Sequence, residues 1–165
     1  GVSMGAAAVK EAVRRILPTL LREFQVVHLC GAGKLDPSLG HLAGYVQYEY
    51  IKSELKDLFA LADIVISRAG ANAICELLAL KKPSLLIPLS AAASRGDQIL
   101  NARSFEKQGF SMVLEEEAVT NEALLQAVHT LYENRASFSS AMDSSQQADS
   151  IETIIRLIEE AAVHT

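Results

Sequence analysis

The fold is decided by residues 64–77, Ile64-Val65-Ile66-Ser67-Arg68-Ala69-Gly70-Ala71-Asn72-Ala73-Ile74-Cys75-Glu76-Leu77. The first four residues show no polar alternation, which is typical of a strand that is covered on both faces. Gly70 then opens a segment whose apolar residues recur at helical spacing. A buried strand, a glycine turn and a helix in this order indicate one unit of a parallel α/β sheet.

The same alternation continues on both sides of this stretch. Strands separated by helices favour right-handed βαβ units, and so an α/β protein of the Rossmann-like class with a doubly wound parallel sheet and helices on both faces. The predicted helices cover residues 6–22, 54–62, 71–81, 97–108 and 120–133, and the predicted strands cover 24–29, 45–48, 64–67, 84–87 and 111–114.

The two ends of the chain carry further predictions. Doubly wound domains normally begin with a strand that delivers the first glycine loop, yet residues 1–6, Gly1-Val2-Ser3-Met4-Gly5-Ala6, are already such a loop. The first strand is therefore expected to be missing, through loss or because the chain was cut from a longer one. Near the other end, the serine-rich residues 137–150 predict a short helix or loop before a C-terminal helix at about 150–162. Residues 1–165 are expected to form one domain without repeats.

Composition excludes several classes of protein. The 165 residues carry a formal charge of −5, so a general nucleic-acid binder would need a hidden basic patch. The two cysteines, Cys30 and Cys75, lie outside any metal-binding pattern and fit a reducing compartment. Apolar runs are interrupted well short of the roughly 20 residues that a membrane span needs. No secretory leader is visible at the start.

Three loops that follow predicted strands are candidates for a binding site, because ligands of such sheets bind beyond the carboxyl ends of the strands. They are residues 1–6, 67–72 and 90–98. The glycines of the first two loops would let an anion approach the backbone N–H groups of a helix start. Two helix starts at one crevice suit a diphosphate better than one does. The alternative for each glycine is a tight turn and nothing more.

Glu76 is the sharper candidate, because it lies three residues after Ala73 on the face that carries the first amides of the predicted helix. A carboxylate beside a phosphate site is suited to a ribose diol, whereas the alternative is a first-turn glutamate that satisfies the helix dipole. Asp97, Gln98 and Asn101 surround another helix start. The two amides share a face and suit sugar hydroxyls. Asp97 is also an N-cap candidate, and a solvated helix start is the alternative for all three.

The histidines offer no catalytic arrangement. His28 lies inside a predicted strand, where packing in the core is the simpler interpretation, and the others lack a carboxylate or cysteine partner at ligand spacing. No catalytic residue, metal ligand or cofactor is therefore expected in this chain.

Residues 67–77 resemble the nucleotide-binding signature of glycosyltransferase family 28, and in particular of its UDP-N-acetylglucosamine transferases that make the lipid-linked peptidoglycan precursor lipid II. The resemblance continues through residues 82–89 and 94–102 and back to residues 1–6, so it spans essentially the whole chain. The form Ser94-Arg95-Gly96-Asp97-Gln98 is similar to enzymes of Gram-positive type.

The resemblance implies the C-terminal, donor-binding half of the two-domain GT-B fold. In that half the first loop would meet the diphosphate, the segment at 50–51 would hold the uracil, the amides at 71–73 would face phosphate, Glu76 would bind the ribose, and the amides on the helix after residue 96 would contact the N-acetylglucosamine. The implied donor-binding residues are Ser3, Gly5, Tyr50, Ile51, Arg68, Gly70, Ala71, Asn72, Ala73, Glu76, Asp97, Gln98 and Asn101.

Three residues depart from the family pattern. Val2 stands where a second glycine is usual, which makes the phosphate loop stiffer. Ala73 stands where threonine is common and so lacks a hydroxyl for phosphate. Asp97 occupies a place where relatives carry glutamine, which leaves its sugar contact open.

The resemblance also implies an activity and its partners. The intact enzyme would be an inverting hexosyltransferase that converts lipid I to lipid II, located in the cytoplasm at the inner face of the plasma membrane. The lipid acceptor, the membrane contact and the catalytic base would belong to a missing N-terminal half. The chain alone is then expected to bind UDP-N-acetylglucosamine weakly, to transfer nothing and to bind no nucleic acid.

Two other classes of function stay open. One is a half-size glycosyltransferase subunit that needs a separate acceptor subunit, and the other is a non-catalytic nucleotide-binding module. A dinucleotide-binding domain is disfavoured, because residues 1–6 lack the G-x-G-x-x-G spacing.

Overall fold

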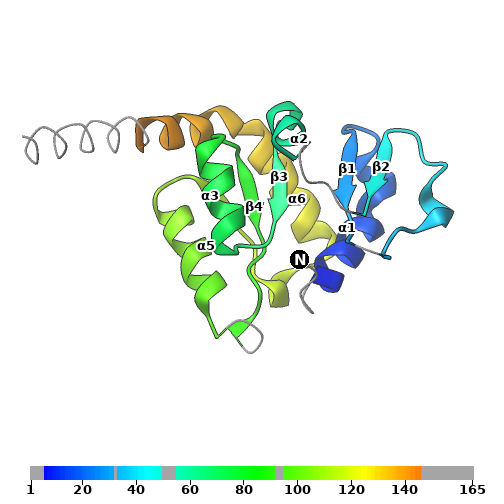
Figure 1. The fold of residues 1–165 in the computed structure, drawn as a ribbon, viewed down its shortest axis with the longest axis horizontal. Coiled ribbons are helices and arrows are strands. Elements are labelled where there is room, and N and C mark those ends of the chain that lie inside the picture. Colours follow the sequence, from blue (N-terminus) through cyan, green and yellow to red (C-terminus); the bar gives the residue numbers. More distant parts are fainter. Residues whose placement is uncertain (1–5, 32, 50–54, 92–94, 146–165) are drawn as a thin grey trace, which may run out of the picture.

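The computed structural model describes residues 6–31, 33–49, 55–91 and 95–145. Short strands alternate with helices along this part of the chain, as Figure 1 shows, which confirms the predicted α/β class. The helices are α1 (Ala6–Leu20), α2 (Leu55–Leu61), α3 (Ala71–Ala79), α5 (Asp97–Lys107) and α6 (Asn121–Glu133), with short 3-10 helices η1 (Pro37–Leu39) and η2 (Glu116–Ala118). The strands are β1 (Val26–Leu29), β2 (Tyr45–Tyr48), β3 (Val65–Ser67), β4 (Ser84–Leu86) and β5 (Ser111–Val113).

The strand β2 has its predicted bounds, and the other elements are one or two residues shorter than predicted, which is the usual behaviour of element boundaries. The predicted helix at 6–22 ends at Leu20, and the predicted helix at 71–81 ends at Ala79. The serine-rich stretch, expected as a short helix or loop, is helical over residues 135–145. The predicted helix at about 150–162 and the first glycine loop lie outside the described residues.

The strands form two parallel ladders, in the orders β1-β2 and β3-β4-β5. In the first, Val26 lies opposite Tyr45, and in the second, Leu85 lies between Ile66 and Met112. All pairs are parallel, as predicted. The structure differs from the predicted single sheet, because no hydrogen-bonded ladder joins β1 to β3 within the described ranges.

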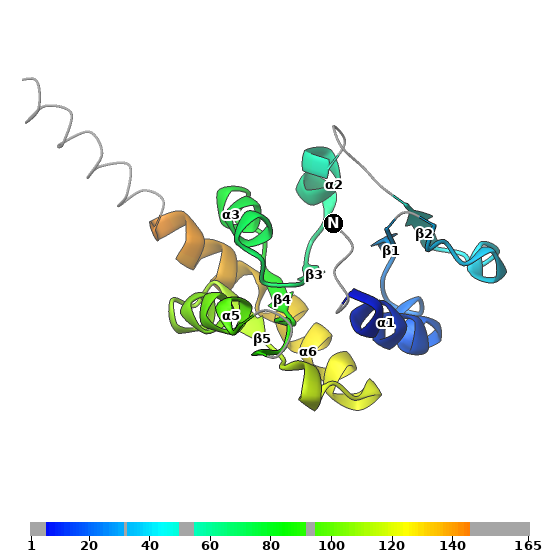
Figure 2. The same ribbon diagram turned by 60° about the horizontal axis from the view of Figure 1, so that its bottom comes forward.

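Helices cover both faces of β4, which is buried at every position. Leu85 and Ile87 face α1 and α6, while Leu86 faces α3 and α5. Figure 2 shows these two helix layers on either side of β3-β4-β5. The first layer contributes the buried residues Ala12, Val13, Ile16, Leu17, Leu20, Leu124, Ala127, Val128 and Leu131, and the second contributes Ile74, Leu77, Ala102 and Phe105.

A polar layer lies between α1 and the β1-β2 ladder. The Arg14 guanidinium donates to Gln47 Oε1 at 3.0 Å, and His28 Nδ1 lies 2.8 Å from the Tyr45 hydroxyl. Burial, followed by the positive charges of Arg14 and Lys10, lowers the pKa of His28 from 6.5 to about 4. The neutral imidazole is therefore the form that the fold favours.

Acid should destabilise the fold through His28. Because its folded pKa lies below its unfolded pKa, the neutral ring contributes stability above pH 6.5 that is lost as the pH falls toward 4. The full shift corresponds to about 3 kcal/mol, and partial exposure of the ring reduces this to about 1 to 2 kcal/mol. We expect urea denaturation between pH 7 and pH 4 to show a correspondingly smaller loss of unfolding free energy for His28→Phe than for the parent chain.

His41→Phe is the control for this titration, because His41 is exposed. His129 works in the other direction: its hydrogen bond to Glu23 raises its pKa, so its contribution is present at low pH and is lost as the pH rises. Both variants keep His129, so its effect cancels in the comparison. Parallel pH profiles for the parent chain and His28→Phe would contradict the assignment.

Candidate functional site

The candidate site lies at the carboxyl ends of β3 and β4, where α3 and α5 begin. The loop of residues 68–70 leads from β3 into α3, and the polypeptide after β4 leads into α5. Figure 1 shows the first residues of both helices at the same end of the sheet. The helix starts that the sequence analysis paired at one crevice are those after residues 1–6 and 67–72; residues 1–5 lie outside the described ranges, so that pairing stays a prediction.

Two side chains of α5 hold the loop after β3 through the backbone N–H and C=O of a single residue, Ala69. Gln98 Oε1 accepts hydrogen bonds from the Ala69 N–H at 3.3 Å and from the Leu89 N–H at 2.9 Å. Asn101 Nδ2 donates to the Ala69 carbonyl at 3.0 Å. Ala69 itself is fully buried. The prediction that Gln98 and Asn101 share a helix face is confirmed, and their contact with the loop backbone is a role that the sequence did not reveal.

These contacts fix the orientation of both amides. Two backbone N–H groups point at one end of Gln98, so that end is the oxygen, and a carbonyl faces the nitrogen of Asn101. Among the described residues, Gln98 Nε2 and Asn101 Oδ1 have no hydrogen-bond partner. The pair thus offers one donor and one acceptor, which matches the hydroxyls of a sugar.

The start of α3 is open to a ligand. Its N-cap is Gly70, with φ −66° and ψ 151°, and no side chain of the described residues caps the first-turn amides. Ala71 and Asn72 are exposed, and a Cβ added to Gly70 would lie 3.7 Å from Gln98 Nε2. Uncapped amides at the positive end of a helix favour an anion.

Glu76 is the sixth residue of α3 and is exposed. It shares a face with Asn72, one turn earlier, while Ile74 and Leu77 face the core. The alternative of a first-turn glutamate that satisfies the helix dipole is wrong, because the first turn of α3 holds no acidic residue and the dipole acts mainly within that turn. Within the described part of the chain, the Glu76 carboxylate makes no ion pair.

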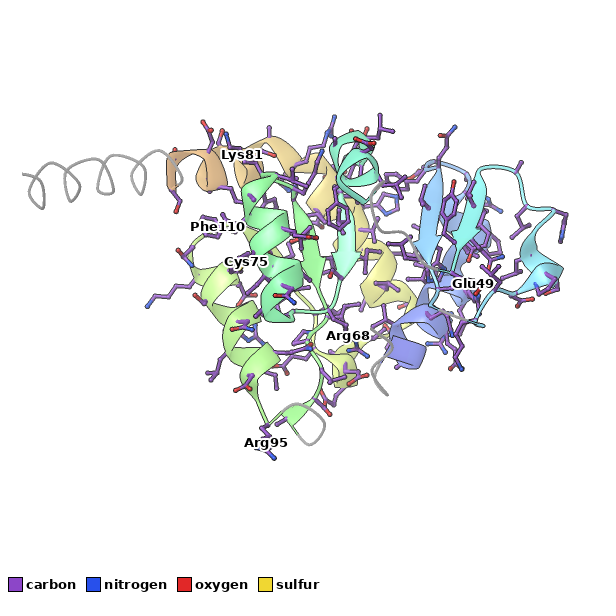
Figure 3. The ribbon with its side chains drawn as sticks, viewed as in Figure 1. Glu49, Arg68, Cys75, Lys81, Arg95 and Phe110 are labelled. Carbon is purple, nitrogen blue, oxygen red and sulfur yellow. The ribbon has the colours of Figure 1, made fainter. Side chains whose placement is uncertain are left out.

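Arg68 follows β3 directly and binds groups of the protein. Its guanidinium donates to the carbonyls of Ile87 and Pro88 at 3.2 and 3.4 Å and forms a 2.9 Å ion pair with Glu116. The two charged side chains are only 15% and 23% exposed. Figure 3 shows Arg68 at the end of β3, on the side toward the start of α1. Its first role is therefore to tie together the segments that leave β3, β4 and β5.

Asp97 is the first helical residue of α5, and the N-cap position belongs to Gly96, whose φ is +86°. The N-cap prediction for Asp97 is therefore wrong by one residue. A glycine fits here because this left-handed backbone conformation strains residues with a side chain. The Asp97 side chain is exposed in the first turn, where a negative charge is favourable.

Four predicted donor-binding residues lie outside the described residues, namely Ser3, Gly5, Tyr50 and Ile51. Their roles at the diphosphate and the uracil stay predictions. Two groups that the sequence did not point to are the Leu89 N–H and the Glu116 carboxylate. Leu89 contributes only its backbone N–H, which no residue type can indicate. Glu116 lies 48 residues after its partner Arg68, so no local sequence pattern links the two.

Two hollows lie elsewhere on the described surface. One of about 90 Å³ lies beside Ile87, Glu116 and the start of α1, and it is too small for a nucleotide. A shallow one of about 480 Å³ lies between α1 and η1, lined by Glu11, Arg14, Arg15, Asp36 and Leu39. Neither contains the amide pair of α5 or the start of α3.

Metal clusters and membrane-spanning helices are both absent from the part of the chain that the structure describes. No group of three or more His, Cys, Asp or Glu side chains is arranged to hold a metal ion. No helix is long and apolar enough to cross a membrane.

Residues 1–158 match the sequence profile of the glycosyltransferase family 28 C-terminal domain. The chain belongs to glycosyltransferase family 28. The match covers all three candidate loops, at residues 1–6, 67–72 and 90–98, and also the segment at 50–51. The family resemblance that the signature at 67–77 indicated is thereby confirmed.

Curated members of the family are similar along nearly the whole chain. A protein of Lachnoclostridium phytofermentans is 66% identical over 160 residues, which is 97% of this chain and 45% of that protein. One of Geobacillus thermodenitrificans is 57% identical over 162 residues, or 98% of this chain and 46% of that protein. Both are named UDP-N-acetylglucosamine--N-acetylmuramyl-(pentapeptide) pyrophosphoryl-undecaprenol N-acetylglucosamine transferase. The chain spans less than half the length of these relatives.

Solved structures of glycosyltransferases share the fold. MurG of Acinetobacter baumannii aligns with 97% of this chain and 48% of its own at a TM-score of 0.68 and 23% identity. The glycosyltransferase of kitacinnamycin aligns with 87% of this chain and 38% of its own at a TM-score of 0.64 and 21% identity. At these identities the likeness concerns the fold alone, and it agrees with a Rossmann-like half of a GT-B enzyme.

Proposed function

We propose that this chain is the donor-binding half of an inverting glycosyltransferase that moves N-acetylglucosamine from UDP to a lipid-linked muramoyl-pentapeptide, converting lipid I to lipid II in peptidoglycan synthesis. The observation that carries the proposal is the 66% identity, over 97% of the chain, to a relative named for this transfer. The site supports it, since an uncapped helix start and a sugar-sized amide pair lie at one sheet edge.

The donor would lie across the starts of α3 and α5. The amides of Ala71, Asn72 and Ala73, with the loop that holds Ser3 and Gly5, would bind the diphosphate, and Gly70 lets it approach closely. Glu76, one turn further along α3, would accept hydrogen bonds from the two ribose hydroxyls.

The remaining contacts fall to the sugar and the base. Gln98 Nε2 and Asn101 Oδ1 would bind hydroxyls of the N-acetylglucosamine, with Asp97 beside them. Tyr50 and Ile51 would hold the uracil. Arg68 would act on the donor mainly through the loop that it ties to the sheet.

The chemistry is a direct displacement at the anomeric carbon. The acceptor oxygen attacks from the face opposite UDP, the bond to the diphosphate oxygen breaks, and the configuration inverts. Negative charge grows on the departing UDP, where uncapped amides and the positive end of α3 would stabilise it more in the transition state than in the ground state. These groups are the contribution of this chain to the rate.

The other requirements belong to a second half. The base that takes the acceptor proton, the lipid acceptor site and the contact with the inner face of the plasma membrane would lie there, with the intact enzyme in the cytoplasm. This chain alone should bind UDP-N-acetylglucosamine weakly and release no UDP at an enzyme-like rate when it is mixed with a lipid I analogue. Turnover by the chain alone would overturn this division of labour.

Glu76→Ala tests the ribose contact. We expect the affinity for UDP, measured by calorimetry, to fall by about 1 to 3 kcal/mol, or about 5- to 150-fold, because a hydrogen-bonded charged group is lost. The parent chain should bind 2′-deoxy-UDP more weakly than UDP, because one of the two hydroxyl contacts is lost, and the variant should not distinguish the two nucleotides.

Glu122→Ala is the matched control, because Glu122 is also exposed on a helix and lies away from the site, in the first turn of α6. It should leave UDP affinity unchanged. If Glu76→Ala still prefers UDP over its deoxy analogue, Glu76 does not bind the ribose.

A further inference from the structure

Two lysines, Lys81 and Lys82, follow α3 at the end of the helix away from the candidate site. Lys81 has a left-handed backbone, with φ 55°, a conformation that usually belongs to glycine at the end of a helix. Its N–H donates to the Leu78 carbonyl at 3.1 Å, and the Lys82 N–H donates to the Leu77 carbonyl at 2.9 Å. These two bonds close the last turn of α3 and direct the chain toward β4.

Lys81 is held in this conformation by the helix of residues 135–145. The Ser139 hydroxyl donates to the Lys81 carbonyl at 3.1 Å, and the Lys81 ammonium forms an ion pair with Asp143. Figure 3 shows Lys81 at the end of α3, beside this helix. A second helix therefore fixes the turn from which the Lys82 side chain projects.

The Lys82 side chain binds a different helix, α2. Its ammonium donates to the carbonyls of Ala60 and Ala62 at 3.1 and 2.7 Å, which lie 22 and 20 residues earlier in the chain. Carbonyls at the C-terminal end of a helix have no partner within the helix, and a positive charge is favourable there. Lys82 thus caps α2 from outside that helix.

One residue therefore links the ends of two helices, because the Lys82 backbone closes α3 and the Lys82 side chain caps α2. The other attachment of α2 is apolar: Phe59 packs against the core cluster that contains Ile74 and Leu77 of α3. With the Phe59 contact alone, α2 could pivot about it. The charged contact at the end of the helix fixes its direction relative to α3.

We propose that Lys82 is a positioning residue for recognition of the base: by fixing α2 relative to α3, it places the segment that would hold the uracil relative to the groups that would hold the ribose and the diphosphate. The inference rests on the proposed function, in which Tyr50 and Ile51, shortly before α2 in the sequence, hold the uracil. Lys82 acts through α2 without touching the nucleotide. Its loss should therefore reduce base selectivity rather than diphosphate binding.

The first measurement needs no nucleotide. In Lys82→Met, which keeps an apolar stem but removes the ammonium, the Ala62 amide should exchange with solvent at least about fivefold faster, as followed by NMR, because the end of α2 opens more often. This amide is bonded to the Leu58 carbonyl of α2 at 3.0 Å. The Leu80 amide, bonded to the Glu76 carbonyl of α3 at 3.0 Å, is the internal control and should keep its rate. An unchanged rate at Ala62 would overturn the proposal.

The second measurement is the preference for UDP over ADP, two nucleotides that share the ribose and the diphosphate. Calorimetry should show that Lys82→Met loses at least about fivefold of the preference of the parent chain, with the affinity for ADP unchanged. Lys82→Arg keeps a charge with several donors and should restore most of the preference. Lys81→Met is the matched control: it removes the neighbouring ammonium and its pair with Asp143 but leaves α2 capped, so the preference should stay.

Three nucleotide results would overturn the inference and leave the proposed function in place. They are a parent-like preference in Lys82→Met, an equal loss of affinity for UDP and ADP, and the same loss of preference in Lys81→Met. A parent chain without preference for UDP would overturn the uracil contact of the proposed function, and this inference with it. The two failures are therefore distinguishable.

Discussion

Arg68→Met is expected to lower the unfolding free energy by about 3 to 5 kcal/mol, because it removes one partner of a mostly buried ion pair. Glu116 would be left without its counter-charge, and the carbonyls of Ile87 and Pro88 would lose a donor. Denaturation in urea, followed by circular dichroism, measures the loss.

Arg103→Met is the matched control. Arg103 also binds two carboxylates, Glu106 and Glu115, each at 2.8 Å, but it is 47% exposed, so its removal should cost less than about 1 kcal/mol. The double variant Arg68→Met with Glu116→Leu should recover much of the stability, because the unpaired charge is gone. Equal losses for Arg68→Met and Arg103→Met would show that burial does not strengthen the Arg68 pair.

Asn101→Asp and Gln98→Glu are expected to differ sharply, although both exchange an amide for a carboxylate. Asn101 uses its nitrogen to bind the Ala69 carbonyl, so aspartate loses a donor and faces that oxygen with a negative charge. The cost should be about 2 to 3 kcal/mol of unfolding free energy. Gln98 uses its oxygen to accept from Ala69 and Leu89, so glutamate keeps both bonds and the stability should change little.

Ligand binding completes this comparison. Gln98→Glu loses the Nε2 donor that would face the sugar, so its affinity for UDP-N-acetylglucosamine should fall while its affinity for UDP stays near that of the parent chain. Asn101→Asp disturbs the loop before α3 and should weaken both ligands. Calorimetry with the two nucleotides separates these outcomes. A destabilised Gln98→Glu would mean that the amide orientation derived from the Ala69 contacts is wrong.

Much of the fold could be predicted because its signals are local. The apolar run at 64–67, the glycine at 70 and the helical spacing after it required no knowledge of distant residues, and the alternation held along the described chain. Strand partners are not local, so the division into two ladders was not visible. A doubly wound pattern predicts one sheet, whereas the described strands form two separate hydrogen-bonded ladders.

The candidate site was predictable to a similar degree. Gln98 and Asn101 were found because their spacing places them on one face of a helix. Their hydrogen bonds to Ala69 could not be predicted, because these bonds go to backbone groups, which every residue type has. The dipole alternative for Glu76 failed for a simple reason: α3 begins at Ala71, which puts Glu76 in the second turn.

The Ala69 backbone connects two helices, since it leads into α3 and is held by side chains of α5. In the proposed site, the groups that would bind the nucleotide and those that would bind the sugar are therefore joined through this one residue. A uridine fragment and a hexose fragment, added separately, should each bind more weakly than the linked donor. Each fragment should also raise the affinity of the other, because both order the loop of residues 68–70. Inhibitors grown from either fragment would thus gain cooperativity by keeping Ala69 in place.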